Sequence, residues 1–169
     1  MAQELNFYTR LYDGFLSDKM CDDYVSTFEE TMKKDAAMKN FMNIVEKYRI
    51  DTMIQDCQWP KDIMWEEFRM KRFLVGDGSK GAEQFGEHVD ITSHAQAKRM
   101  LILMVYLNDD FNGGETVFPH YGDAIKPKKG SILIFPPLWM YLHRGNPPLA
   151  PGYAKYFLMT YLNYEPIKN

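Results

Sequence analysis

The sequence predicts a mainly β fold, a double-stranded β-helix or jelly roll, with supporting helices near the N-terminus. Apolar residues recur at helical spacing in the first third of the chain. From about Trp65 onward, short β-branched and aromatic runs alternate with turn sequences such as Gly-Asp-Gly and Asn-Gly-Gly. The 169 residues fit one domain (1–169), with helical support at about 16–64 and a jelly-roll core at about 65–164.

The N-terminal segment is predicted to open with one strand and to continue into two helices. Leu5–Phe15 is an extended run that contains an Asp-Gly turn near its end, and Ser17 is placed to cap the first helix. Apolar residues then recur at helical spacing up to about Lys34, namely Met20, Tyr24, Phe28 and Met32. The second helix, Ala36–Tyr48, carries one apolar stripe made of Met38, Phe41, Met42 and Val45. Because both helices are amphipathic, we expect each to pack against the β core.

Seven short runs in the remainder of the chain are predicted strands. In chain order they are Phe68–Val75, Gly86–Ile91, Met100–Leu107, Glu115–Phe118, Gly130–Phe135, Met140–Arg144 and Tyr153–Asn163. Short strands at this spacing, with turn residues between them, indicate a sandwich or a barrel. Helices first and strands afterwards therefore favour a jelly roll that is supported on one side by helices.

Composition and charge exclude several classes of function. The net charge is −3 with both signs interspersed, which argues against a nucleic-acid binder that depends on a broad basic face. Cys21 and Cys57 are the two cysteines and form no CxxC pair, so neither a disulfide framework nor a zinc site is indicated. The sequence has no apolar run of membrane-spanning length, and Met1–Arg10 lacks the apolar stretch of a signal peptide. We expect a soluble cytoplasmic protein with no membrane partner; its oligomeric state is not predicted.

Two histidines and one aspartate on predicted strands form a candidate metal site. His88 and Asp90 are two residues apart, so on a strand they project from the same face and can hold one ion. That pair alone is weak, but His143 follows on a later strand, and two histidines with one carboxylate match the facial triad of non-haem Fe(II) oxygenases. Zinc hydrolases are the competing class because some use the same ligand types, although the helical HExxH pattern is missing.

Lys155 is the second candidate functional residue. It lies in an apolar and aromatic run, where strand alternation puts it on one face with Phe157, Met159 and Tyr161. A lysine that points into the core is costly unless a carboxylate meets it, and the distal carboxylate of 2-oxoglutarate is the candidate. The alternative is that Lys155 points outward at the start of its strand.

The region Phe85–Leu162 resembles the catalytic core of the 2-oxoglutarate/Fe(II) dioxygenases, specifically the prolyl 4-hydroxylase-like branch. The matching motifs occur in the order of that family: Phe85-Gly-Glu-His-Val-Asp90, Tyr106-Leu-Asn-Asp109, Gly113-Gly-Glu-Thr-Val-Phe-Pro119, Lys126-Pro-Lys-Lys-Gly130, Phe135-Pro136, His143 and Lys155. The opening segment Leu11–Ser17, followed by Cys21, resembles the entry strand and first helix of the family. The resemblance covers nearly the whole chain, and Lys34–Trp65 is its least diagnostic part.

The resemblance implies a role for each matched residue. His88, Asp90 and His143 would bind iron and carry the catalysis, and Lys155 would anchor the co-substrate 2-oxoglutarate. Thr116 would lie near the same carboxylate, and Tyr161 would line the pocket. Arg99 and Phe85 would contact the substrate, although Arg99 could instead be a solvated surface residue. The cofactors implied are Fe(II), 2-oxoglutarate and O2, with ascorbate as a further candidate.

The sequence departs from the family pattern before the first metal histidine. Prolyl hydroxylases usually have tyrosines there, one of which donates a hydrogen bond to 2-oxoglutarate. The counterparts here are Phe73 and Phe85, which have no hydroxyl group. The Gly-rich loop Gly76–Gln84 corresponds to one that closes over a peptide in this family, or is a simple surface excursion.

The predicted function is hydroxylation of a substrate coupled to oxidative decarboxylation of 2-oxoglutarate. A peptidyl proline in a peptide or protein is the first candidate substrate. Another amino-acid side chain or a small metabolite is the alternative within the enzyme class. A non-catalytic jelly-roll binding module and a zinc hydrolase are the alternatives outside it.

Overall fold

The computed structural model describes residues 2–27, 35–76, 81 and 83–164. The helices are α1 (Asp18–Ser26) and α2 (Asp35–Asp51), with single 3-10 turns at Asp56–Gln58, His94–Gln96 and Trp139–Tyr141. The strands are β1 (Ala2–Asn6), β2 (Thr9–Tyr12), β3 (Ile63–Trp65), β4 (Arg69–Leu74), β5 (Phe85–His88), β6 (Arg99–Tyr106), β7 (Asn112–Gly113), β8 (Thr116–Phe118), β9 (Asp123–Ile125), β10 (Ile132–Phe135), β11 (His143–Gly145), β12 (Pro148–Leu149) and β13 (Ala154–Tyr164). Neither of the two α-helices that can be described is long and apolar enough to span a bilayer.

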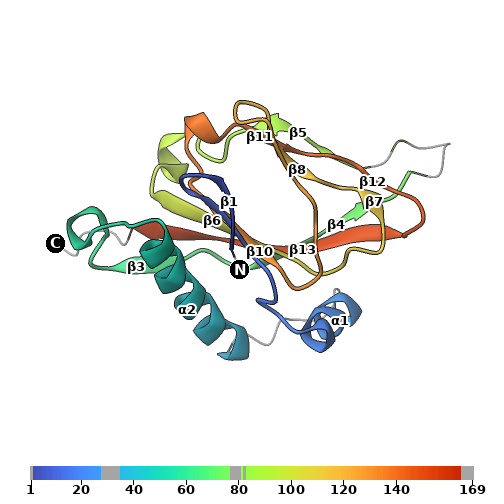
Figure 1. Ribbon diagram of the computed structural model, residues 1–169, viewed down its shortest axis with the longest axis horizontal. Coiled ribbons are helices and arrows are strands. Elements are labelled where there is room, and N and C mark those ends of the chain that lie inside the picture. The colour runs from blue at the N-terminus through green and yellow to red at the C-terminus, as the bar shows by residue number, and fades with distance from the viewer. Residues whose placement is uncertain (1, 28–34, 77–80, 82, 165–169) are drawn as a thin grey trace.

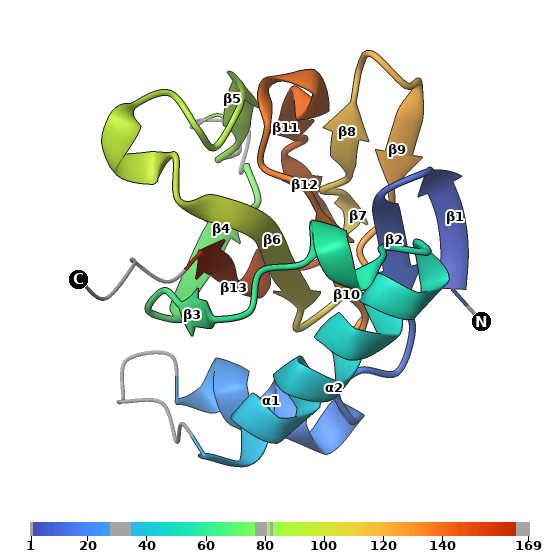
Figure 2. The same cartoon turned by 90° about the vertical axis from the view of Figure 1, so that its left-hand side faces the viewer.

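The strands form two facing sheets, with the helices on the outer side of the larger one. The main sheet has the order β1-β2-β10-β6-β13-β3, and β4 also pairs with β13. The smaller sheet has the order β5-β11-β8-β9, and β7 pairs with β12. Figure 1 labels these elements, and Figure 2 shows the small sheet over one face of the main sheet and α1 and α2 against the other.

Strand alternation divides the apolar side chains between two cores. The core between the main sheet and the helices takes one set of alternate residues from β6, namely Leu101, Leu103 and Val105. The core between the two sheets takes the other set, namely Ile102, Met104 and Tyr106. The same alternation on β13 directs Lys155, Phe157, Met159 and Tyr161 toward the space between the sheets, as predicted. This space contains the candidate site.

The helices agree with the sequence prediction except in detail. Ser17 caps α1, since its hydroxyl accepts a hydrogen bond from the Met20 amide. α1 ends at Ser26 with Thr27 as its C-cap, so the prediction that this helix continues to about Lys34 is wrong. Phe28 and Met32 lie outside the described residues, as does the side chain of Met38. The prediction that Met42 lies on the packed stripe of α2 is wrong. Phe41, Val45 and Tyr48 are the buried residues of that helix, and Met42 is 44% exposed because it lies to one side of that stripe.

The opening segment is a hairpin, so the prediction of one strand over Leu5–Phe15 is also wrong. The chain reverses at the exposed residues Phe7 and Tyr8, and β2 returns beside β1. Asn6 stands at the first position of this turn, but neither of the central residues, Phe7 and Tyr8, is a typical turn residue. A residue far along the sequence stabilises the turn, because the Tyr48 hydroxyl on α2 donates a hydrogen bond to the Tyr8 carbonyl at 2.7 Å. The predicted Asp-Gly turn follows β2, with Gly14 at φ 66°.

Candidate metal centre and adjoining pocket

The three predicted metal ligands meet between the two sheets. β5 and β11 pair antiparallel with His88 opposite His143, and their ring centroids are 4.2 Å apart. Asp90 Oδ2 lies 3.6 Å from His143 Nε2. One ligand atom from each of the three residues lies within 4.8 Å of the other two, as a shared ion requires. The prediction that Asp90 continues the strand of His88 is wrong, because β5 ends at His88 and Asp90 lies in a bend beyond it.

Both histidines are oriented by the backbone carbonyl two residues before them. Nδ1 of His88 lies 2.9 Å from the Gly86 carbonyl, and Nδ1 of His143 lies 2.9 Å from the Tyr141 carbonyl. A carbonyl oxygen only accepts, so each Nδ1 carries the proton and each Nε2 keeps a lone pair for a metal. Burial lowers the pKa of His143, against the opposing effect of Asp90, which favours the neutral form that ligates metals.

Asp90 has one satisfied and one unsatisfied carboxylate oxygen. Oδ1 accepts a hydrogen bond of 2.5 Å from the Tyr161 hydroxyl, whose pKa is raised by burial and by the Asp90 charge. Oδ2 is buried and has no hydrogen-bond partner among the described residues. A buried carboxylate oxygen without a partner is costly, and a cation beside His143 would remove that cost. The donor set therefore fits a divalent metal, and two histidines with one carboxylate fit Fe(II).

Arg99, which is paired with Glu66, binds the backbone of the candidate metal ligand Asp90. The Arg99 guanidinium donates to both Glu66 carboxylate oxygens, at 2.8 and 3.0 Å, and through Nη1 to the Asp90 carbonyl at 2.9 Å. It also lies 3.8 Å from the centroid of the Tyr161 ring. The Arg99 and Glu66 side chains are only 11% and 12% exposed. Arg99 was predicted as a substrate contact; it lines the pocket, but its guanidinium already makes these intramolecular bonds.

We expect Arg99→Met to lower the free energy of unfolding by about 3 kcal/mol, because it leaves the shielded Glu66 carboxylate without its main partner. Glu66→Met should cost a similar amount. The double variant should cost less than the sum of the two, because no unpaired charge remains. Denaturant unfolding of the metal-free protein measures all three.

Arg69→Met is the matched control for this cycle. Arg69 also contacts Glu66, at 3.3 Å, but its side chain is 50% exposed, so its loss should cost less than about 1 kcal/mol. Strictly additive losses in the Arg99 and Glu66 variants would contradict a coupled pair.

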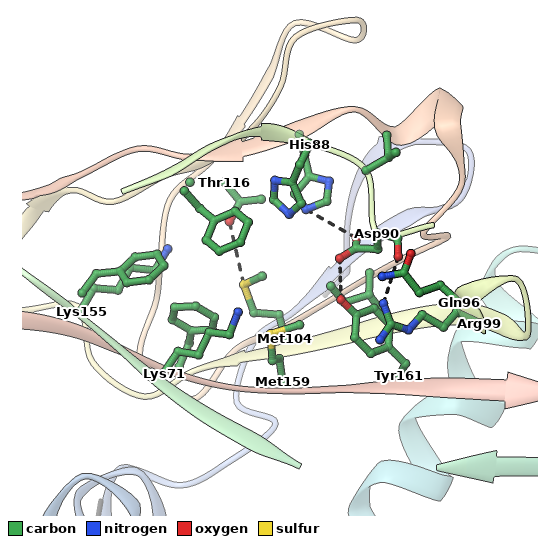
Figure 3. Close-up of a pocket in the computed structure, with 17 residues that line it drawn as sticks. Lys71, His88, Asp90, Gln96, Arg99, Met104, Thr116, Lys155, Met159 and Tyr161 are labelled. Atoms are coloured by element: carbon green, nitrogen blue, oxygen red, sulfur yellow. Dashed lines mark hydrogen bonds and ion pairs between the residues drawn. The ribbon is translucent and has the colours of Figure 1, made fainter. Parts of the chain in front are cut away.

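A pocket of about 210 Å³ adjoins the three metal-ligand candidates. All eight predicted site residues line it: His88, Asp90, His143, Lys155, Thr116, Tyr161, Arg99 and Phe85. In Figure 3, Lys155 lies on one side of the cavity and Asp90 with Tyr161 on the other. Sequence reasoning missed Lys71, which projects into the same cavity from β4. Alternation could have identified it, because it lies two residues before Phe73, which was already assigned to the pocket region.

Lys155 points into the pocket, so the alternative of an outward orientation is wrong. Its side chain is nearly inaccessible, and Nζ donates to the Gly114 carbonyl at 2.7 Å. Burial lowers the pKa of Lys155 to about 8, although Glu115 opposes that shift. Nearby, the Thr116 hydroxyl is buried and lies 2.8 Å from the Tyr106 hydroxyl. This end of the pocket offers a desolvated cation and a hydroxyl group to a ligand.

Phe73 and Phe85, the predicted counterparts of the tyrosines that prolyl hydroxylases usually have, both line the pocket. Phe85 stacks on Phe73 with a centroid distance of 6.3 Å and lies 4.3 Å from the His88 ring. Phe85 is 41% exposed, so it also borders the pocket opening. The proposed closing loop Gly76–Gln84 falls mainly outside the described residues.

Comparisons with known sequences agree with this geometry. A family model, the 2OG-Fe(II) oxygenase superfamily, matches residues 74–163. A protein of Acanthamoeba polyphaga mimivirus, named "Putative prolyl 4-hydroxylase", is 37% identical over 62 residues, which make up 37% of this chain and 23% of that protein. The chain thus matches less than a quarter of that relative's length.

Solved structures of low sequence identity share the fold. A viral collagen prolyl hydroxylase from Paramecium Bursaria Chlorella virus-1, in complex with 2OG, has a TM-score of 0.73 at 23% identity, covering 94% of this chain and 97% of that one. A Pseudomonas putida prolyl-4-hydroxylase has a TM-score of 0.64 at 16% identity, covering 94% of each chain. A Trichoplax adhaerens prolyl hydroxylase, in complex with a hypoxia inducible factor peptide, has a TM-score of 0.67 at 14% identity, covering 94% and 84%. The likeness confirms the predicted mainly β jelly roll with N-terminal helices.

Proposed function

The chain belongs to the 2OG-Fe(II) oxygenase superfamily, and we propose that it hydroxylates a peptidyl proline while 2-oxoglutarate is converted to succinate and CO2. One observation carries this proposal. One small pocket contains a histidine–aspartate–histidine set, in which one carboxylate oxygen has no partner among the described residues, and, on another side, the buried cation of Lys155. That combination suits a metal and a compact dicarboxylic acid.

His88, Asp90 and His143 would hold Fe(II) through their free Nε2 atoms and Asp90 Oδ2. Iron bound there would supply the redox centre at which O2 oxidises 2-oxoglutarate to succinate and CO2. Tyr161 keeps its proton and holds Asp90 Oδ1, which turns Oδ2 toward the metal position. Arg99 fixes the Asp90 backbone, so that the carboxylate enters the site already oriented.

Lys155 would bind the distal carboxylate of 2-oxoglutarate, and Thr116 would offer its hydroxyl to the same group. The Lys155 ammonium is already desolvated in the free protein, so an incoming carboxylate can form a strong charge-assisted hydrogen bond with it. Apolar side chains on the same wall, including Met104 and Phe157, limit the water that can compete for it.

A peptidyl proline is the proposed substrate because the partly exposed Phe85 ring lines the pocket and because similar structures are named as prolyl hydroxylases, one of them with a bound peptide. The half-exposed ring of Phe85 offers a flat apolar surface to a pyrrolidine ring. Arg99, whose donors are engaged, is proposed as a wall of the substrate site through its guanidinium face.

Reducing conditions are part of the proposal. Both cysteines are free, Cys21 buried and Cys57 exposed, which suits a reducing cytoplasm in which iron stays as Fe(II). Ascorbate is proposed as an accessory reductant, and omitting it in one arm of the assay tests that point.

The test combines Fe(II)-loaded protein, 2-oxoglutarate, ascorbate, air and a panel of proline-containing peptides. Succinate is measured by NMR, and the peptides are measured by mass spectrometry with fragmentation. We expect succinate to form together with an added oxygen atom on a proline, and neither to form when zinc replaces iron. An added oxygen on another residue, or 2-oxoglutarate consumption without peptide oxidation, would reject proline. No consumption of 2-oxoglutarate would leave a binding module, and O2-independent turnover with zinc would indicate a hydrolase.

We expect the affinity for 2-oxoglutarate to fall about tenfold from pH 7 to pH 9. The pKa of Lys155 in the free protein is lowered to about 8, so this range takes the residue from mostly charged to mostly neutral, and the neutral amine no longer attracts a carboxylate. Lys155→Arg, which keeps its charge throughout, should bind without that loss. Anaerobic titration of the Fe(II) protein measures both; an equal decline in the two proteins would assign the pH effect to another group.

A further inference from the structure

Lys71 is a second cation in the pocket, and the metal and co-substrate roles assigned above do not use it. It extends from β4 into the cavity, where its ammonium lies 4.9 Å from the centroid of the Phe85 ring. No hydrogen bond or ion pair joins it to any residue in the described ranges, whereas Lys155 has the Gly114 carbonyl and Arg99 has Glu66. The cation of Lys71 thus faces the cavity without an acceptor.

Burial makes the charged form of Lys71 less stable in the free protein. Lys71 is partly buried against aromatic side chains, and this burial, together with the charge of Arg69, lowers its pKa. Asp90 is the acidic group that partly offsets the effect. A cation held in such surroundings is stabilised when an anion enters the cavity.

The register of β4 and β13 locates Lys71 between the two ends of the pocket. Phe73 is opposite Lys155, and Lys71 is opposite Phe157, one step of two residues toward Tyr161. Tyr161 in turn contacts Asp90. Lys71 therefore lies nearer to the metal ligands than Lys155 does, and the Phe85 ring beneath it packs against His88.

The charges of the pocket match a ligand with two carboxylates. Arg99 and Glu66 cancel each other, and Fe(II) held by Asp90 and two neutral histidines would keep one positive charge at the metal position. Lys155 and Lys71 then remain as two separate positive groups on one wall. A dicarboxylic 2-oxo acid carries one negative charge for each.

This inference rests on the proposed function: we propose that Lys71 binds the carboxylate adjacent to the keto group of 2-oxoglutarate, while Lys155 binds the distal carboxylate. Phe73 and Phe85 cannot donate to that carboxylate because they have no hydroxyl, and Lys71 projects from the same wall with three donors. Lys71 then helps to set the orientation in which the 2-oxo acid meets the metal.

The test compares two ligands that differ in one end. 2-Oxoglutarate and 2-oxopentanoate share the five-carbon chain and the carboxylate beside the keto group, but the second lacks the distal carboxylate. Each is titrated anaerobically into the Fe(II) form of the wild type, Lys71→Met and Lys155→Met, and binding is followed by the visible absorbance of the iron chelate. Lys39→Met, an exposed lysine on α2, controls for the change of net charge.

We expect Lys71→Met to weaken both ligands by the same factor, about tenfold or more, as loss of a charged hydrogen bond does. Lys155→Met should weaken 2-oxoglutarate and leave 2-oxopentanoate unchanged, and Lys39→Met should change neither. Unchanged binding in Lys71→Met would overturn the proposal and point to a contact with the hydroxylated substrate. Weakening of 2-oxoglutarate alone would also overturn it, because Lys71 would then face the distal carboxylate.

Two further measurements distinguish a failure of the proposed function, or a loss of folding in the variant, from a failure of the role proposed for Lys71. Wild type that binds neither 2-oxo acid would reject the proposed function itself, not only the role of Lys71. Thermal unfolding of the metal-free Lys71→Met should match or exceed that of the wild type, since a desolvated charge without an acceptor has been removed. If that variant does not fold, Lys71→Gln tests the same contact.

Discussion

Asp90→Ala is expected to abolish both iron binding and hydroxylation. The Asp90 carboxylate contributes the single negative charge among the three candidate ligands, and its Oδ2 is buried and has no hydrogen-bond partner among the described residues. Losing a group that merely hydrogen-bonds a metal ligand costs about 10–100-fold in affinity or activity, so losing the ligand itself should cost more than about 100-fold. Anaerobic Fe(II) titration and the succinate assay measure the two effects independently.

Asp123→Ala is the matched control for this loss. Asp123 on β9 also has a buried Oδ2 without a partner among the described residues, but it does not line the pocket. Its removal should leave iron binding and turnover within about twofold of wild type, the range typical of sites outside the machinery. Iron binding that survives in Asp90→Ala would show that the metal is held elsewhere.

The candidate site was largely predictable because its signals are local. His88 and Asp90 are two residues apart, and Lys155 is a single cation in an apolar strand, so residue type and alternation identify them without any tertiary information. The pairing of β5 with β11 then brings His143 opposite His88, which the resemblance implied and alternation alone could not. The error in the bend at Asp90 is small, since a strand end and a continued strand both keep Asp90 near His88.

The features that were not predicted depend on contacts between distant segments. The β1–β2 hairpin turns at Phe7 and Tyr8 because β2 pairs with β10, far along the chain, and because Tyr48 binds the turn. The Arg99–Glu66 pair joins residues 33 positions apart, and the sequence around either residue does not indicate that the two side chains form a pair. Strands of two or three residues, such as β7 and β12, are too short to show a period at all.

Lys155→Met is expected to weaken 2-oxoglutarate binding by more than about 10-fold and to leave Fe(II) binding unchanged, because the proposed role of Lys155 is to contact the co-substrate and not the metal. The cation is almost fully buried, and its one hydrogen-bond acceptor among the described residues is the neutral Gly114 carbonyl, so no carboxylate of the described residues forms an ion pair with it. Methionine fills nearly the same volume, which makes lost charge the main change.

The same variant separates affinity from chemistry. With 2-oxoglutarate in large excess, the chelate should still form through the metal and the proposed Lys71 contact, so turnover should recover in part as the co-substrate concentration rises. A defect that excess 2-oxoglutarate does not relieve would mean that Lys155 orients the co-substrate during the reaction, and affinity equal to wild type would place the distal carboxylate away from Lys155. The outcome decides whether the buried charge of Lys155 serves binding alone or also the geometry in which O2 is used.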